Sequence, residues 1–99
     1  MIVELPKELT IAGAAELKAL LLSALDGEGP LELDARAVAE VDVAGLQLLC
    51  AASRSARGRG RSVGLAPGPR SPALTQAVAT AGFGHGEDDR WLAGEADHA

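Results

Sequence analysis

Short runs of β-forming residues alternate with longer helical stretches, and this order constrains the fold more than any other feature of the sequence. The predicted strands are residues 2–5, 9–11, 31–34 and 63–66. The predicted helices are residues 14–25, 43–57 and 72–81. Helices that separate most of the strands are typical of α/β domains, in which parallel strands are joined by right-handed crossovers. We therefore expect an α/β fold with a small mixed sheet of about four strands packed with about three helices.

The first and third predicted helices each carry one continuous apolar face. In the first helix the apolar residues recur at steps of three and four, the spacing that places side chains on one side of a helix: Leu17, Leu20, Leu21, Ala24 and Leu25. In the third helix Ser71 is the expected N-cap, Pro72 the first helical residue and Gly82 the end. Its predicted buried face consists of Leu74, Ala77, Val78 and Ala81. Both faces are aliphatic, which suits close packing of helices on a sheet.

The length and the change of composition near the C-terminus predict one domain followed by a tail. A chain of 99 residues fills a single hydrophobic core. From residue 84 the sequence becomes polar and acidic, which predicts a domain over residues 1–83 and a flexible tail over residues 84–99. Trp91 and Leu92 are the exception, because two large apolar side chains could anchor this segment to the domain.

The charge pattern argues against nucleic acid as the main partner. The formal net charge is −5, which repels a phosphate backbone. Five arginines nevertheless occur between residues 54 and 70 without an intervening acid: Arg54, Arg57, Arg59, Arg61 and Arg70. Cations favour helix C-termini, so a solvated helix end is the favoured interpretation. A phosphate or partner site is the alternative.

Nothing in the sequence indicates an oxidising compartment or a membrane. The single cysteine cannot form an internal disulfide, and the N-terminus lacks the pattern of a signal peptide. The longest nearly uncharged apolar run, residues 41–53, contains Asp42 and is too short to span a bilayer. We expect a cytoplasmic protein without direct membrane insertion.

The residue types needed for catalysis are scarce. His85 and His98 both fall in the predicted tail, without a cysteine or an acid at metal-ligand spacing. Cys50 lies within an apolar helix, which favours a buried and unreactive thiol. The glycine-rich residues 82–86 follow a helix, whereas a phosphate-binding loop follows a strand and opens a helix. We therefore expect no enzyme activity, no metal and no cofactor.

The stretch from Val41 to Leu49 has the composition of a helix start. Asp42 can accept hydrogen bonds from the first backbone N–H groups, and its charge suits the positive end of the helix dipole. Val43, Ala44 and Gly45 present almost no side chain, so a partner could approach this helix end closely. On the alternative account, Asp42 is only a cap and Gly45 is buried against a neighbouring strand.

The helix that follows is apolar nearly all round from residue 44 to 52. One side must pack on the sheet, through either Leu46, Leu49 and Cys50 or Leu48 and Ala52. The other side would then expose apolar surface beside Asp42, as a protein-docking site does, unless neighbouring helices cover both sides.

The run Asp42-Val43-Ala44-Gly45-Leu46 resembles the signature loop of STAS domains, the family of anti-sigma-factor antagonists and sulfate-transporter tails. Members typically have Asp-Ser-Ser-Gly-Leu or Asp-Thr-Ala-Gly-Leu here, and the antagonists are switched off by phosphorylation of the second small position. That position is Ala44 in this chain and the preceding one is Val43, so neither has a hydroxyl. The resemblance, over residues 2–83, implies an interaction module that keeps the docking surface and lacks the usual phosphoswitch.

The resemblance also implies a class of partner. The implied contact residues are Asp42, Val43, Ala44, Gly45, Leu46 and Leu48. The implied partner is a kinase-type anti-sigma factor, or a chemotaxis or two-component regulator in bacterial signalling, and a homodimer also stays open. Two other classes compete: a STAS subunit that braces the ATPase of a lipid-transport ABC system, and a small-ligand or nucleotide-binding domain that uses the arginines. Phosphorylation at another serine is open as well, at Ser53, Ser55, Ser62 or Ser71.

Overall fold

Three parallel strands form the main sheet of the computed structural model, which describes residues 1–86 and 90–93. β1 (Ile2–Glu4), β3 (Leu31–Asp34) and β5 (Val63–Leu65) lie in the order β1-β3-β5. A separate short ladder pairs β2 (Glu8–Leu9) with β4 (Glu40–Val41), also in parallel. A helix lies between the two strands of every pair along the chain, and such crossovers produce parallel pairing. The expected α/β class is confirmed, with parallel pairs where a mixed sheet was expected.

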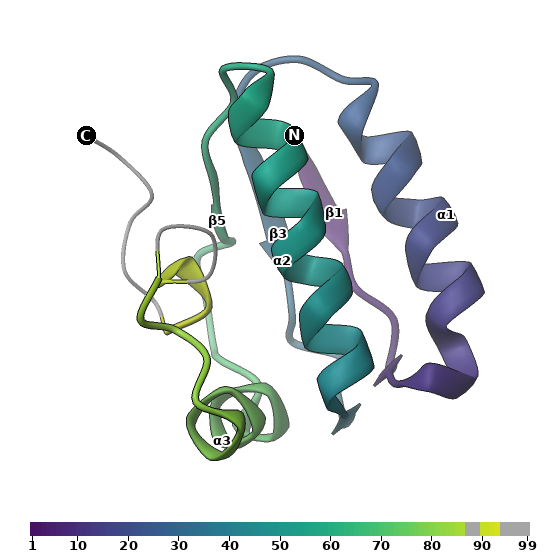
Figure 1. Ribbon diagram of the computed structural model, residues 1–99, viewed down its shortest axis with the longest axis vertical. Helices are drawn as coiled ribbons and strands as arrows, with labels where there is room; N and C mark the ends of the chain where they lie inside the picture. The colour runs from purple at the N-terminus through teal and green to yellow at the C-terminus, as the bar shows by residue number, and fades with distance from the viewer. Residues whose placement is uncertain (87–89, 94–99) are drawn as a thin grey trace.

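The two longest helices form one layer over the sheet. α1 (Ala14–Leu25) and α2 (Val43–Gly58) lie side by side, and both begin at the same end of the molecule (Figure 1). α3 (Pro72–Ala81) packs near β4 at that end. Two short 3₁₀ segments, Ile11–Gly13 and Arg90–Ala93, precede α1 and follow α3.

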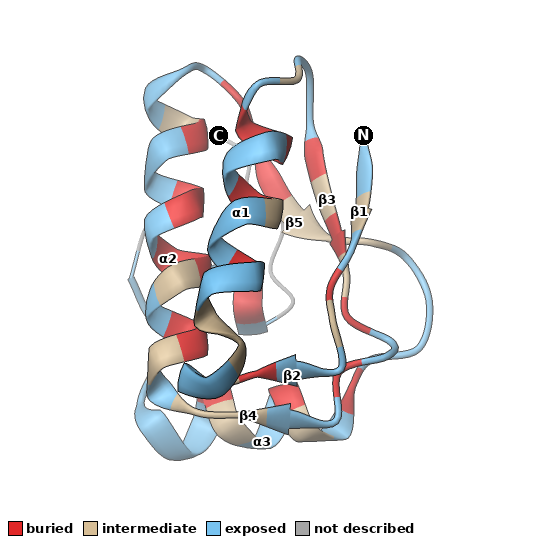
Figure 2. Ribbon diagram, turned by 90° about the vertical axis from the view of Figure 1, so that its right-hand side faces the viewer, coloured by how far each residue is buried: buried red, intermediate tan, exposed pale blue. Residues whose placement is uncertain are grey.

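The described helices cover one face of the sheet, and the strand sequences reflect this (Figure 2). In β3, Leu31 and Leu33 are buried while Glu32 and Asp34 are half-buried. Alternate residues of a strand point to opposite faces, so the leucines face the helices and the acids face outward. Val3 lies opposite Leu33 in the register and joins the inner face.

The predicted helix faces are largely confirmed. In α1 the buried residues are Leu17, Leu21, Ala24 and Leu25. In α3 the Ser71 hydroxyl accepts a hydrogen bond from the Leu74 N–H at 3.1 Å, and Gly82 ends the helix in the left-handed region at φ 76°. The prediction that Ala81 is buried was wrong, because it ends a helix whose inner side is formed by Leu74 and Val78.

The second predicted strand is shorter than expected, and a further strand follows β3. β2 ends at Leu9, because the Ile11 N–H donates to the side chain of Asp42 at 2.9 Å rather than to a strand. β4, at Glu40–Val41, is not among the strands predicted from the sequence. Two residues carry too little periodicity to be recognised as a strand without the partner strand.

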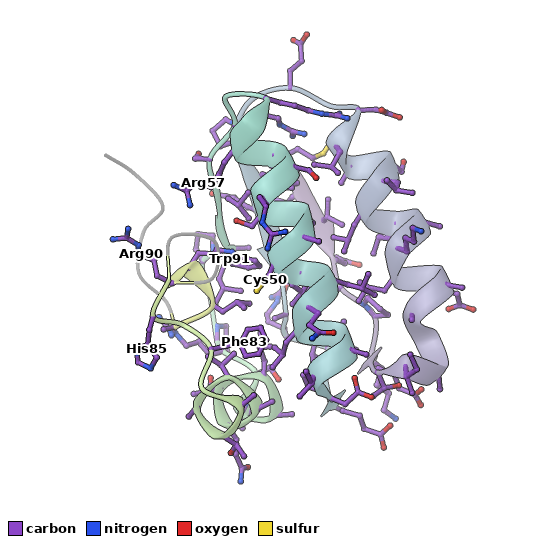
Figure 3. The ribbon with its side chains drawn as sticks, viewed as in Figure 1. Cys50, Arg57, Phe83, His85, Arg90 and Trp91 are labelled. Carbon is purple, nitrogen blue, oxygen red and sulfur yellow. The ribbon has the colours of Figure 1, made fainter. Side chains whose placement is uncertain are left out.

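The segment after α3 contributes to the core. Trp91 and Leu92 are only 1% and 2% exposed, so the anchor suggested by these two residues is present. Figure 3 shows Trp91 on the inner side of its segment, whereas His85 and Arg90 point outward. Core residues therefore occur beyond residue 83, at Trp91 and Leu92. The flexibility predicted for residues 87–89 and 94–99, which include His98, lies outside the described residues.

Candidate functional site

Asp42 joins the start of α2 to the turn that follows β2. One carboxylate oxygen accepts a hydrogen bond from the Gly45 N–H at 3.1 Å, and the other accepts from the Ile11 N–H at 2.9 Å. The Asp42 N–H in turn donates to the carbonyl of Leu9 at 3.0 Å. We call the surface formed by residues 8–12 and 40–44 the Asp42 corner. Two of these hydrogen bonds, those with Ile11 and Leu9, thus connect the two segments of this corner, which lie about thirty residues apart.

The hydrogen bonds also fix the charge of Asp42. Donation from the Ile11 N–H, and then from the Gly45 N–H, holds the pKa of the carboxyl below its ordinary value, while partial desolvation opposes this. Hydrogen bonds to the ionised form favour that form. The carboxylate is therefore charged at neutral pH. The predicted N-cap is confirmed, and the contact with Ile11 adds a role that a cap alone does not have.

Gly45 and Leu46 lie inside the molecule. A Cβ added to Gly45 would overlap the carbonyl group of Leu9 and would lie 2.9 Å from the Leu9 Cβ. Leu46 has no exposed surface. The expectation that Gly45 receives a partner backbone was wrong, because β2 already occupies that space, and Leu46 fills the core instead of the interface. The alternative account, with Gly45 buried against a strand, describes the structure.

Val43 and Ala44 remain accessible at the start of α2. Val43 is 48% exposed and Ala44 is half-buried. Ile11 lies on the other segment of the corner and is 73% exposed. This position was not predicted, because Ile11 was assigned to a strand, where alternation alone does not show which face is covered.

Leu48 belongs to a different surface. It lines a shallow apolar groove of about 120 Å³ between α1 and α2, together with residues of both helices: Lys18, Leu21, Leu22, Leu25, Ala51, Ala52 and Ser55. The buried side of α2 includes Leu46, Leu49 and Cys50 as well as Ala52. Neighbouring elements therefore bury seven of the 16 residues of α2, and its exposed apolar surface is smaller than the sequence suggests.

Two of the clustered arginines bind the C-terminal end of α1. Arg61 is 7% exposed, and its guanidinium donates to the carbonyls of Ala24 and Gly29, both at 2.8 Å. Arg59 donates to the carbonyl of Leu25 at 2.6 Å. The last carbonyls of a helix lack partners within the helix, and arginines often satisfy them. The favoured interpretation, a solvated helix end, is confirmed only in part. Arg61 is buried rather than solvated, and both arginines bind carbonyls at the end of α1 rather than at the end of their own helix.

The comparison with protein families agrees with this architecture. The family model described as "Mlab, STAS domain" matches residues 1–93. The chain belongs to this STAS family. The match extends past residue 83 and includes Trp91 and Leu92. Neither the curated proteins nor the solved structures gave a significant match.

The other residues of this STAS domain that were considered for chemistry differ in their exposure. Cys50 is buried and His85 is exposed. Among the four serines considered for phosphorylation, Ser53 and Ser71 are buried, whereas Ser55 and Ser62 are exposed. Within residues 1–86 and 90–93, no three His, Cys, Asp or Glu side chains are grouped so that they could hold a metal ion. No helix in the same part of the chain is long and apolar enough to cross a membrane.

Proposed function

We propose that this STAS domain is a non-catalytic interaction module of the bacterial cytoplasm that binds a regulatory protein through the Asp42 corner. The role resembles that of an anti-sigma-factor antagonist, with a kinase-type anti-sigma factor or a chemotaxis or two-component regulator as the partner. One observation carries the proposal. Asp42 holds the start of α2 in place, while Val43 and Ala44 present small apolar side chains without a hydroxyl.

The geometry of the corner supports docking. The hydrogen bonds of Asp42 order the backbone before any partner arrives, which lowers the conformational entropy lost on binding. Apolar side chains at an ordered helix start give a partner area to bury, and a half-buried alanine at position 44 lets it approach closely. Because Gly45 and Leu46 are buried, they support this surface from within.

The missing hydroxyls also favour a second candidate function. A subunit that permanently braces the ATPase of a lipid-transport ABC system needs no switch for release, and Val43 and Ala44 offer none. The genes beside the one encoding this chain separate the two candidates: a permease and an ATPase for the second, a histidine kinase or an anti-sigma factor for the first.

The experiment compares two matched alanine-to-aspartate variants. Ala44 and Ala73 are both the second residue of a helix, after Val43 in α2 and Pro72 in α3, and both are half-buried. An aspartate in the first turn suits the helix dipole, so neither change should unfold the domain. We measure affinity by isothermal titration calorimetry with the purified anti-sigma-type kinase domain and with the purified ATPase.

We expect Ala44→Asp to weaken binding of the true partner by about tenfold or more, through desolvation of the new charge and repulsion from Asp42. Ala73→Asp should bind as the wild type does. Equal, wild-type affinity of both variants for the partner would show that docking occurs elsewhere. Binding of the kinase domain would support the signalling role, and binding of the ATPase would support the role in a lipid-transport ABC system.

A further inference from the structure

We propose that the Asp42 corner recognises a protein surface that presents Arg or Lys side chains beside an apolar contact. This inference rests on the proposed function and adds the chemistry of the partner. It is carried by two features of this corner: a pair of exposed glutamates on the β2–β4 ladder, and two exposed apolar residues that flank the carboxylate of Asp42.

The two glutamates place like negative charges next to each other on the β2–β4 ladder. Glu8 of β2 lies directly opposite Glu40 of β4 in the parallel register, and both residues are exposed. Like charges directly opposite each other on a sheet are destabilising. The structure gives neither side chain an ion pair among the described residues, although Lys7 precedes β2. A cation supplied by a partner would relieve this repulsion.

The apolar part of the corner comes from both of its segments. Ile11 is 73% exposed and Val43 is 48% exposed. The Ile11 N–H bonds to the carboxylate of Asp42, and Val43 follows Asp42 in the chain, so the two residues flank the same carboxylate. Among the described residues, the other large apolar side chains with comparable exposure are Met1, Ile2 and Leu22. Met1 and Ile2 lie at the start of β1, and Leu22 borders the groove between α1 and α2.

The negative charge of the Asp42 corner favours a basic partner over an anionic one. The Asp42 corner carries three carboxylates, on Glu8, Glu40 and Asp42, beside a small apolar surface. Anionic lipid headgroups and nucleic-acid phosphates would be repelled by such a surface. A protein with basic and apolar side chains complements it, and arginine suits best because its guanidinium pairs with carboxylates in a fixed, bidentate geometry.

Site-specific photo-crosslinking in the native cell tests this inference. The photoreactive residue p-benzoylphenylalanine replaces Ile11 or Val43 in the full chain, with Ile2 as the matched control because it is a similarly exposed apolar residue on β1. Mass spectrometry identifies the cross-linked partner segment. We expect cross-links from positions 11 and 43 and none from position 2, to a segment with a net positive charge and apolar residues.

A charge reversal tests the electrostatic part separately. Glu8→Lys/Glu40→Lys keeps two like charges opposite each other, so it should fold as the wild type does, and it should reduce the cross-link yield by about tenfold or more. Asp26→Lys/Glu28→Lys makes the same change in net charge just beyond the other end of α1, and should leave the yield unchanged. If circular dichroism shows that the reversal unfolds the domain, Glu8→Gln/Glu40→Gln replaces it.

The outcomes separate this inference from the proposed function. Cross-links from positions 11 and 43 that are insensitive to the charge reversal, or that join an acidic segment, would overturn the inference and leave docking at the corner intact. Cross-links that form at position 2 but not at positions 11 and 43 would overturn both.

Discussion

The substitution Gly45→Ala tests how closely α2 packs against β2. In an unobstructed helix this change stabilises by about 1 kcal/mol, because alanine loses less conformational entropy than glycine. Here the new methyl group would overlap the carbonyl group of Leu9 and press on its Cβ at 2.9 Å. The obstruction is backbone, so no flexible side chain can move aside to relieve it.

The expected cost follows from these opposing terms. Overpacking costs about 1–3 kcal/mol, and occasionally more when the neighbouring backbone must shift. Moving β2 away from α2 would also stretch the bonds from Asp42 to Leu9 and from Ile11 to Asp42. We take the upper end of the range, about 3 kcal/mol, and subtract about 1 kcal/mol of helix propensity. Gly45→Ala should therefore destabilise the domain by about 2 kcal/mol.

Urea unfolding followed by circular dichroism measures this effect, with Gly58→Ala as the control. Gly58 lies in the same helix, and a Cβ added there meets no atom within 4 Å. The control should be neutral or stabilised by up to about 1 kcal/mol. If Gly45→Ala were as stable as the control, the packing of α2 against β2 described here would be incorrect. Gly45→Arg, with a larger side chain at the same site, should unfold the domain.

Two further predictions concern Asp42 and Arg61. Hydrogen bonds to Asp42 depress the pKa of its carboxyl, so the stability that this carboxylate contributes is fully present above the ordinary value of about 3.8 and is lost as the pH falls through the lower folded value. In unfolding experiments between about pH 6 and pH 2, the difference in stability between the wild type and Asp42→Asn should narrow below about pH 4. A constant difference would contradict the prediction. Arg61→Ala leaves the carbonyls of Ala24 and Gly29 without their partner, which should lower the free energy of unfolding in urea by about 2–5 kcal/mol. The control Arg70→Ala, at an exposed arginine, should lower it by less than about 1 kcal/mol. Equal losses for the two variants would refute the structural role of Arg61.

The parts of this fold that depend on local sequence were predictable. The apolar stripe of α1, the cap and stop of α3 at Ser71 and Gly82, and the Asp42 cap all follow from spacing and residue type within one element. Each of these features is determined by residues a few positions apart, so periodicity and capping rules are sufficient to find them.

The parts that depend on contacts between distant segments were not predictable. Ile11 reaches the site through a bond to a residue 31 positions away, and Arg61 reaches Ala24 across 37 positions. The burial of Gly45 depends on the placement of β2, a strand of two residues. Short strands and side-chain bonds to remote carbonyls leave no periodic pattern, so the sequence identified half of the Asp42 corner and missed the half that includes Glu8 and Ile11.

Hydrogen–deuterium exchange of the domain with and without its bound partner protein tests the central claim most directly, because it compares all faces in one measurement. Docking at the Asp42 corner predicts slower exchange in residues 8–12 and 40–44 when the partner is bound, with little change in residues 24–30 and 57–62 at the opposite end. The groove between α1 and α2, which includes Leu22 and Ala51, should also exchange as in the unbound domain. Protection confined to that groove or to the arginine end, with unchanged exchange at residues 8–12 and 40–44, would contradict the account.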